Sequence, residues 1–243
     1  IGMGGRIVFN SPESQLQVSC ETAGTLQNAF VYLTANRATN TTFRDRVAGA
    51  NGNIAITLTG GVTGIFEDTV NTTTVANGDL INFSITTGTG TDNLAMTTCA
   101  VELVTTNSAS MFIAGGFGGI THLANTTYYQ PTSGLMGLTD TTELYNSDAQ
   151  FAATYSNLGA NVTTNTVTAD TVVRTRINKA NGNQSVTYAS SVTGRTEDTT
   201  NTDVVAATDE HNYQVVVGAT GTSIAFRSIS MLNTTSAGGT TTS

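Results

Sequence analysis

The chain has 243 residues and a formal net charge of −8, which comes from 9 basic and 17 acidic side chains. Only 11% of its residues are charged, whereas typical soluble domains carry about a quarter. Thr, Gly and Asn make up about two-fifths of the chain, and these residues favour strands and turns. The composition therefore excludes an α-helical protein.

Two classes of partner are also excluded by composition. The chain is acidic and has no cluster of basic residues, so we expect no nucleic-acid partner. Its apolar runs are shorter than the roughly 18–20 residues that cross a bilayer, so we expect no membrane partner.

Strands are expected at short, regular intervals along the chain. Residues 43–47 alternate in character, which predicts a strand with Arg44 and Arg46 on one face. The following Asn51-Gly52 predicts a type I′ hairpin turn, because both central residues of that turn need positive φ. Further strands are expected over residues 54–58, 81–85 and 94–103. This spacing is typical of an antiparallel sandwich or a closed barrel.

An internal repeat organises the chain. Residues 42–101 align without a gap with residues 172–231 at an offset of 130, and about 21 of the 60 pairs are identical. Both copies contain Ala-Asn-Gly-Asn, then Val-Thr-Gly, then Glu-Asp-Thr. Further upstream the offset becomes 129, where Asn28 and Asn36 match Asn157 and Asn165. We interpret this repeat as a duplicated domain.

The repeat predicts an all-β chain with two tandem antiparallel β-sandwich domains. In chain order we expect an N-terminal arm (1–11), a first domain (12–103), a Gly-rich linker or crossover (104–144), a second domain (145–235) and a flexible tail (236–243). The linker is interpreted as an extended crossover that includes the first strand of the second domain. The alternative is an exposed loop that contacts a partner.

The repeated motifs resemble a known module. They are Ala-Gly-Thr-Leu-x-Asn at residues 23–28, Thr-Gly-x-x-Glu-Asp-Thr-x-Asn-Thr at residues 63–72 and 193–202, and Val-Ala-x-Gly-Asp at residues 75–79. This pattern is similar to jelly-roll modules in surface proteins of tailed bacteriophages, namely fibres, spikes and capsid decorations. The second copy departs from it at residues 206–209, where Ala-Ala-Thr-Asp replaces the Gly-Asp turn. The resemblance covers about 85 residues in each half and implies jelly-roll domains, often assembled as trimers.

The repeated carboxylates are the strongest polar candidates for a site. Glu67-Asp68 and Glu197-Asp198 recur at the same place, and with Asn71, Asp79, Asn201 and Asp209 they offer oxygen ligands for Ca²⁺. Neighbouring strand residues point to opposite faces, however, so one pair does not readily chelate a single ion. The preferred interpretation is that Asp68 and Asp198 accept hydrogen bonds from their own turns.

The remaining reactive residues predict no catalytic constellation. His122 and His211 are not equivalent in the repeat, and neither lies in a metal-binding or triad-like pattern. We therefore expect no enzyme, no catalytic residue, no bound cofactor and no metal.

Two other residue sets have open alternatives. The four arginines at positions 44, 46, 174 and 176 are interpreted as a solvated sheet face balanced within the chain, with pairing to acidic residues of a neighbouring subunit as the alternative. Cys20 and Cys99 are both expected to point inward, either as buried thiols or as a disulfide between the first and last strands.

These patterns together predict a structural protein of a virion, on the outside of a phage capsid or tail. It is expected to form a homo-oligomer, with a trimer favoured, and to bind other virion proteins such as the major capsid protein. Host-surface glycans are a further candidate partner. One alternative is an extracellular filament in which residues 6–9 complete a neighbour's sheet. Another is a carbohydrate-binding adhesin that uses Tyr128 or Tyr129.

Overall fold

The structure is a computed structural model that describes residue 13 and residues 17–89, 93–106, 110–116, 121–132, 134–135, 140–144 and 146–235. The described residues form strands and turns with no α-helix among them, so the all-β prediction is confirmed. They divide into two compact units, the first over residues 22–106 and the second over residues 17–21 together with those from 110 onward. The predicted arm (1–11) and tail (236–243) lie outside the described residues.

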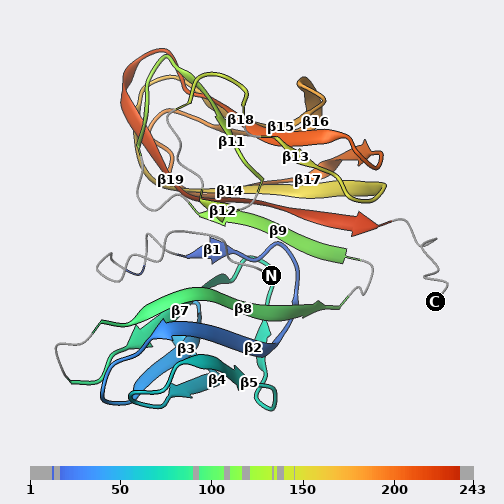
Figure 1. Cartoon of the computed structure of the whole chain (residues 1–243). Coiled ribbons are helices and arrows are strands. Elements are labelled where there is room, and N and C mark those ends of the chain that lie inside the picture. Colours follow the sequence, from blue (N-terminus) through green and yellow to red (C-terminus); the bar gives the residue numbers. More distant parts are fainter. Residues whose placement is uncertain are drawn as a thin grey trace. The chain divides into compact units, whose positions relative to one another are not determined.

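The first unit is a sandwich of two antiparallel sheets (Figure 1). One sheet has the order β7-β3-β4, and in the other β2 pairs with β8 along one edge and with β5 and β6 along the opposite edge. The strands are β2 (Gly24–Ala35), β3 (Thr41–Val47), β4 (Ala50–Leu58), β5 (Gly64–Asp68), β6 (Thr73–Val75), β7 (Leu80–Thr86) and β8 (Ala95–Thr105).

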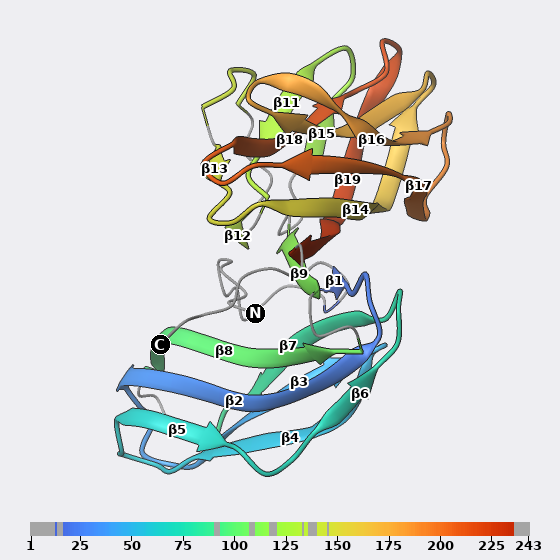
Figure 2. The same cartoon turned by 90° about the vertical axis from the view of Figure 1, so that its right-hand side faces the viewer.

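The second unit has the same two layers, with more strands (Figure 2). One sheet contains β9-β19-β14-β17 and the other contains β11-β18-β15-β16. These strands are β9 (Ser110–Gly116), β11 (Thr127–Gln130), β14 (Ala153–Val167), β15 (Thr171–Ile177), β16 (Ala180–Tyr188), β17 (Gly194–Val205), β18 (Glu210–Val216) and β19 (Gly221–Thr235). Three shorter strands pair with them, namely β10 (Thr121–Leu123), β12 (Gly134–Leu135) and β13 (Ser147–Asp148), and residues 17–21 of this unit include β1 (Val18–Ser19).

Part of the expected linker takes part in the second sandwich. Among its described residues, β9 and β10 pair with β19, and β11 pairs with β18. The start of the first unit also differs from the prediction. The predicted first domain begins at residue 12, whereas residues 17–21 group with the second unit.

The two units repeat each other strand by strand. β3 and β4 pair in the same register as β15 and β16, displaced by 130 residues, and both pairs have an irregularity after the first arginine, Arg44 or Arg174. Asn28 and Asn157 occupy matching breaks in the register of β2 and β14, and both have positive φ (50° and 53°). Asn tolerates this conformation better than most residues.

Apolar side chains from both sheets meet in the core of the second unit. Tyr155 and Leu158 come from one sheet, whereas Val173, Tyr188 and Tyr213 come from the other, and all five are at most 1% exposed. Strand alternation places these residues inward, and burial of a side chain of this size contributes about 1.5–3 kcal/mol.

The hairpin turn that we expected at Asn51-Gly52 lies elsewhere, so this prediction is wrong. The residues with positive φ between β3 and β4 are Ala48 (50°) and Gly49 (80°), whereas Asn51 and Gly52 lie within β4. Gly52 is required for a different reason: a Cβ atom there would lie 2.0 Å from Oδ2 of Asp45. Glycine therefore permits a close approach between the strands rather than a turn.

The turn that departs from the repeat pattern is nevertheless formed in both units. The amide of Ala76 donates to Oδ2 of Asp79 at 2.7 Å, and the amide of Ala206 donates to Oδ2 of Asp209 at 2.8 Å. The residue before each aspartate has positive φ, 88° at Gly78 and 74° at Thr208. A β-branched residue is strained in this region, whereas glycine is not.

Exchange of these two residues should shift the stability of the two units in opposite directions. Thr208→Gly should stabilise the second unit by about 1 kcal/mol, and Gly78→Thr should destabilise the first by at least about 1 kcal/mol. Hydrogen exchange of the full chain in denaturant, followed by mass spectrometry, resolves the two units. Equal stability of wild type and Thr208→Gly would contradict the strain at this position.

Candidate functional site

The carboxylates of Asp68 and Asp198 lie at the centre of two matching turns. Oδ1 of Asp68 accepts from the backbone amides of Val70 (3.2 Å) and Asn71 (3.0 Å), and Oδ2 accepts from the side-chain amide of Asn71 (3.0 Å). Oδ1 of Asp198 accepts from the amide and hydroxyl of Thr200 and from the amide of Asn201. The predicted hydrogen bonds to the turn backbone are therefore confirmed.

Each of these carboxylates also joins the two sheets of its sandwich. Oδ2 of Asp68 accepts from the backbone amide of Ala55 in β4 at 3.0 Å, and Oδ2 of Asp198 accepts from Ser185 in β16 at 2.9 Å. β4 and β16 end their sheets. Such an edge exposes amides that have no strand to pair with.

A second side chain satisfies the next outward amide in each unit. The Asn53 amide donates to Oγ1 of Thr73 at 2.8 Å, and the Asn183 amide donates to Oδ1 of Asp203 at 2.6 Å. We call the four acceptors, Asp68, Thr73, Asp198 and Asp203, the edge caps. They close the same side of both sandwiches, where β4 and β16 face the edge strands of the other sheet.

Next to these caps, each unit buries one aspartate and one threonine, and the two residue types occupy opposite positions in the two units. The second unit pairs Thr175 in β15 with Asp203, whose Oδ2 accepts from Oγ1 of Thr175 at 2.5 Å. The matching positions of the first unit hold Asp45 and Thr73. Asp45 is fully buried, and this burial raises its pKa in spite of the opposing effect of Thr73. The two units therefore bury the same two residue types at these positions with their places exchanged.

The hydrogen bonds leave the repeated carboxylates poorly disposed to bind a cation. Burial raises the pKa of Asp68, but the hydrogen bonds from Asn71 and Ala55 outweigh it, so the net pKa is lowered; that of Asp198 is lowered in the same way. Glu67 is exposed, and Glu197 pairs with Arg195 at 2.8 Å. In the part of the chain that the structure describes, no group of three or more His, Cys, Asp or Glu side chains could hold a metal ion.

Removal of an edge-cap carboxylate should destabilise its unit. We expect Asp198→Asn to lower the free energy of unfolding of the second unit by about 1–3 kcal/mol, because several partly buried hydrogen bonds lose a charged acceptor. Asp68→Asn should act likewise on the first unit. Asp170→Asn is the control and should change little, since Asp170 is exposed.

The same turns predict the response to metal removal. Because both oxygens of Asp68 and Asp198 already accept N–H groups, EDTA should leave the melting temperature unchanged, and calcium should give no heat of binding in calorimetry. A rise in melting temperature with calcium that Asp198→Asn abolishes would restore the metal-site hypothesis.

The arginines at the ends of β3 and β15 hold their own hairpins. Nη1 of Arg46 donates to Oδ1 of Asn51 at 2.6 Å, and Nη1 of Arg176 donates to Oδ1 of Asn181 at 2.6 Å. Each guanidinium also donates to a carbonyl of the adjacent turn, that of Gly49 or of Lys179. This agrees with balance inside the chain. The alternative contact with a neighbouring subunit remains a prediction.

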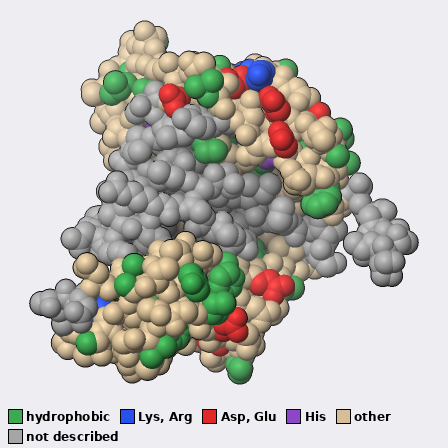
Figure 3. Space-filling view, viewed as in Figure 1, with side chains coloured by type: hydrophobic (Ala, Val, Ile, Leu, Met, Phe, Trp, Pro, Cys, Tyr) green, Lys and Arg blue, Asp and Glu red, His purple; other side chains and the backbone are tan. Residues whose placement is uncertain are grey.

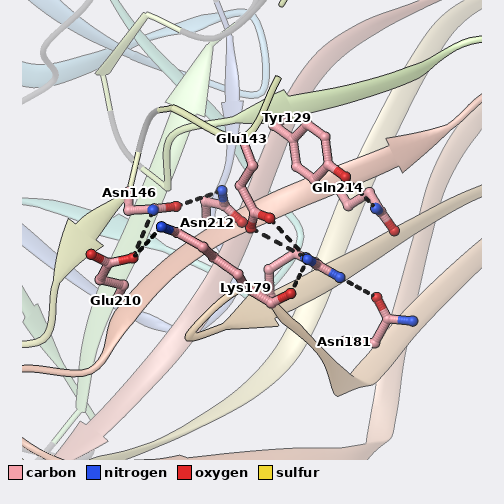
Figure 4. Close-up of polar contacts among 9 residues, drawn as sticks. Tyr129, Glu143, Asn146, Lys179, Asn181, Glu210, Asn212 and Gln214 are labelled. Atoms are coloured by element: carbon pink, nitrogen blue, oxygen red, sulfur yellow. Dashed lines mark hydrogen bonds and ion pairs between the residues drawn. The ribbon is translucent and has the colours of Figure 1, made fainter. Parts of the chain in front are cut away.

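A cluster of polar side chains covers the outer side of β11, β15 and β18 in the second unit (Figure 4). Arg176 binds both carboxylate oxygens of Glu143, at 3.2 and 2.8 Å, and its guanidinium lies 5.8 Å from the ring centre of Tyr129. Further hydrogen bonds join Asn146 to Glu210 and Asn212. These contacts hold Glu143 and Asn146 against the sheet, so the polar groups of the cluster bind one another.

The two tyrosines considered for sugar binding have different environments. Tyr128 is 4% exposed, and its hydroxyl accepts a hydrogen bond from the Leu123 amide at 3.0 Å. A buried ring offers no face to a sugar, which rules out Tyr128 as a stacking platform. Tyr129 is half-buried, and its hydroxyl accepts from Nε2 of Gln214 at 3.1 Å.

Both histidines are buried in the second unit. His122 lies in β10 against Tyr128 and Phe226, and its Nε2 is 3.3 Å from Nε2 of Gln130. His211 lies in β18 against the ring of Tyr155. Burial lowers the pKa of each histidine to about 4, and at His211 it outweighs the opposite effect of Asp148. Both are therefore neutral at pH 7 and packed among aromatic rings.

These histidines should make the second unit sensitive to mild acid. A pKa of about 4 in the folded state, against about 6.5 in the unfolded chain, stabilises the fold fully above pH 6.5. This contribution, up to about 3 kcal/mol for each histidine, is lost as the pH falls toward 4. Hydrogen exchange at pH 7 and pH 5 should show the loss in the second unit.

His211→Ile provides the matched variant, because Ile81 occupies the corresponding position of the first unit. The variant should reduce the acid sensitivity of the second unit by about half. This comparison also cancels Glu21, whose buried carboxyl has a raised pKa and acts in the opposite direction. An unchanged pH dependence in His211→Ile would overturn the assignment.

The two cysteines do not form a disulfide. Cys20 is fully buried and Cys99 is half-buried, and burial raises the pKa of the Cys99 thiol. The sequence left open whether the two cysteines are thiols or form a disulfide, and in the structure they are thiols.

A charged cluster around Glu21 was missed by sequence reasoning. The Glu21 carboxylate is 1% exposed and binds Nη2 of Arg195 and the hydroxyl of Ser230. It fills the space beside Gly159, where a Cβ atom would lie 2.5 Å from Oε1 of Glu21. The only signal in the sequence was a glycine and serines in strands that otherwise alternate, and this does not identify an acidic partner far away in the chain.

Comparison with known proteins adds no relative. Neither a family model nor a curated protein sequence matches the chain. In the described residues, no helix has the length and apolar character needed to span a membrane.

Proposed function

We propose that both units are jelly-roll domains that arose by internal duplication. The second unit supports this through its strand order. When eight strands are lettered B to I, a jelly roll pairs them as B-I-D-G and C-H-E-F, and β9-β19-β14-β17 with β11-β18-β15-β16 have that order. The seven strands of the first unit correspond to D through I in the same two sheets, because β5 and β6 together match β17.

The chain is, on this proposal, a structural protein of a virion, on the capsid or tail of a tailed phage. The observation that carries it is that the repeated polar residues serve the scaffold in both units. Asp68 and Asp198 link two sheets, and Asp79 and Asp209 hold matching turns. Duplication has thus multiplied a rigid framework, as expected of an assembly subunit. The assignment to a phage capsid or tail rests on the resemblance of the motifs to phage surface modules.

In this role the protein forms a homo-oligomer, with a trimer favoured, and binds other virion proteins such as the major capsid protein. It stabilises the particle and presents loops outward without catalysing a reaction. The alternative, a carbohydrate-binding adhesin, would depend on Tyr129, because Tyr128 is buried. The side chain of Tyr129 already contacts Gln214 and Arg176.

Two measurements test this function. Light scattering of the purified full chain should give a discrete oligomer, with three times the chain's 25.1 kDa expected. Gold-labelled antibodies raised against it should decorate particles released from the strain that carries the gene. Long fibres formed by the purified protein alone would favour the filament instead, and glycan binding lost in Tyr129→Ala would favour the adhesin.

A further inference from the structure

One face of the sandwich differs between the two units more than its core does. On the outer side of β8, β2 and β5, Phe30 lies between Glu67 and Ala100, and Tyr32 lies between Ile65 and Thr98. The matching rows of the second unit are Gly159 between Glu197 and Ser230, and Asn161 between Arg195 and Ser228. Residues directly opposite each other on neighbouring strands point to the same face. The first unit is thus apolar where the second is polar.

The second unit shows what this face accepts. Residues 17–21 lie on it, with the Ser19 amide donating to Oγ of Ser228 at 3.3 Å and the Glu21 carboxylate bound by Arg195 and Ser230. The polar face therefore binds a segment of the chain through an ion pair between Glu21 and Arg195. The surface of the first unit is different: in Figure 3, hydrophobic side chains gather on it with acidic side chains beside them.

Two apolar side chains on this face of the first unit are exposed, whereas Phe30 is half-buried. Tyr32 is 41% exposed and Ile65 is 63% exposed, and Glu67 beside them is also exposed. Exposed carboxylates at Glu67 and Glu102 border this apolar surface. The second unit presents a cation, Arg195, to this face, whereas the first presents apolar side chains and a carboxylate. The first unit's face therefore fits a segment that carries apolar side chains and a positive charge.

One segment of the chain has this chemistry. Of the 9 basic residues, only Arg6 is followed by three large apolar residues, Ile7, Val8 and Phe9. β-branched and aromatic residues favour an extended conformation. These four residues lie outside the described part of the chain.

We propose that the face formed by Phe30, Tyr32 and Ile65 binds residues 6–9 of a second copy of this chain. The apolar side chains cover Tyr32 and Ile65, and Arg6 pairs with Glu67. This inference rests on the proposed assembly function, to which it adds the contact surface and the segment that fills it. Desolvated charge pairs of this kind determine register and specificity between copies.

The first test changes the face to residues that the fold already tolerates. Tyr32→Asn with Ile65→Arg installs the residues of the second unit at the same positions, Asn161 and Arg195. Self-association of the full chain, measured by analytical ultracentrifugation, should weaken by at least about tenfold. Val192→Thr, which alters an exposed valine elsewhere, is the control and should not change it. Circular dichroism confirms that each variant is folded.

The second test identifies the occupant. Arg6→Glu should weaken association by at least about tenfold, and Arg6→Glu combined with Glu67→Arg should restore most of it. A synthetic peptide of residues 4–10 should compete with self-association of the wild type. Unchanged association in the face variant, or in Arg6→Glu, would overturn the inference, as would failure of the charge exchange to restore it. If these variants fail while antibodies still label particles, the proposed function stands without this contact.

Discussion

The fold depends on how the unpaired amides at one edge of each sandwich are satisfied. β4 and β16 end their sheets, and an unpaired backbone N–H that is removed from water costs about 1–3 kcal/mol. Acceptors from the opposite sheet solve this problem in both units, with Asp68 and Asp198 bound to the amides of Ala55 and Ser185. One carboxylate thereby shapes a turn, joins two layers and protects an edge from pairing with another chain.

Much of the repeated sequence follows from this constraint. The glycine after Asn51 is needed because the buried Asp45 side chain occupies the space of a Cβ atom, and Gly182 has the same relation to Thr175. The exchange of Asp45 and Thr73 for Thr175 and Asp203 shows that the location of the buried pair matters more than which strand supplies the acid. The carboxylates of Asp68 and Asp198 are thus committed to the scaffold, and this supports the assembly role that we propose.

The two units differ where the scaffold makes no demand. Their cores, turns and edge caps correspond, whereas the outer face that holds Tyr32 and Ile65 in one unit holds Asn161 and Arg195 in the other. The second unit uses this face to bind residues 17–21. In the first unit Tyr32 and Ile65 are exposed on this face, which is the face that we propose for contact with another copy. The same framework of strands can in this way carry two different surfaces.

Sequence alone determined the all-β class, the 130-residue repeat and the hydrogen-bonding role of Asp68 and Asp198, because strand alternation and turn chemistry are local properties. It placed the hairpin turn wrongly, since Asn-Gly is a turn signal only when no close approach requires the glycine. The burial of His122 and His211, the reversed Asp45–Thr73 pair and the partner of Glu21 were decided only by the tertiary structure. Each depends on which distant strand lies opposite, and that is fixed by the packing of one sheet on another rather than by neighbours in the chain.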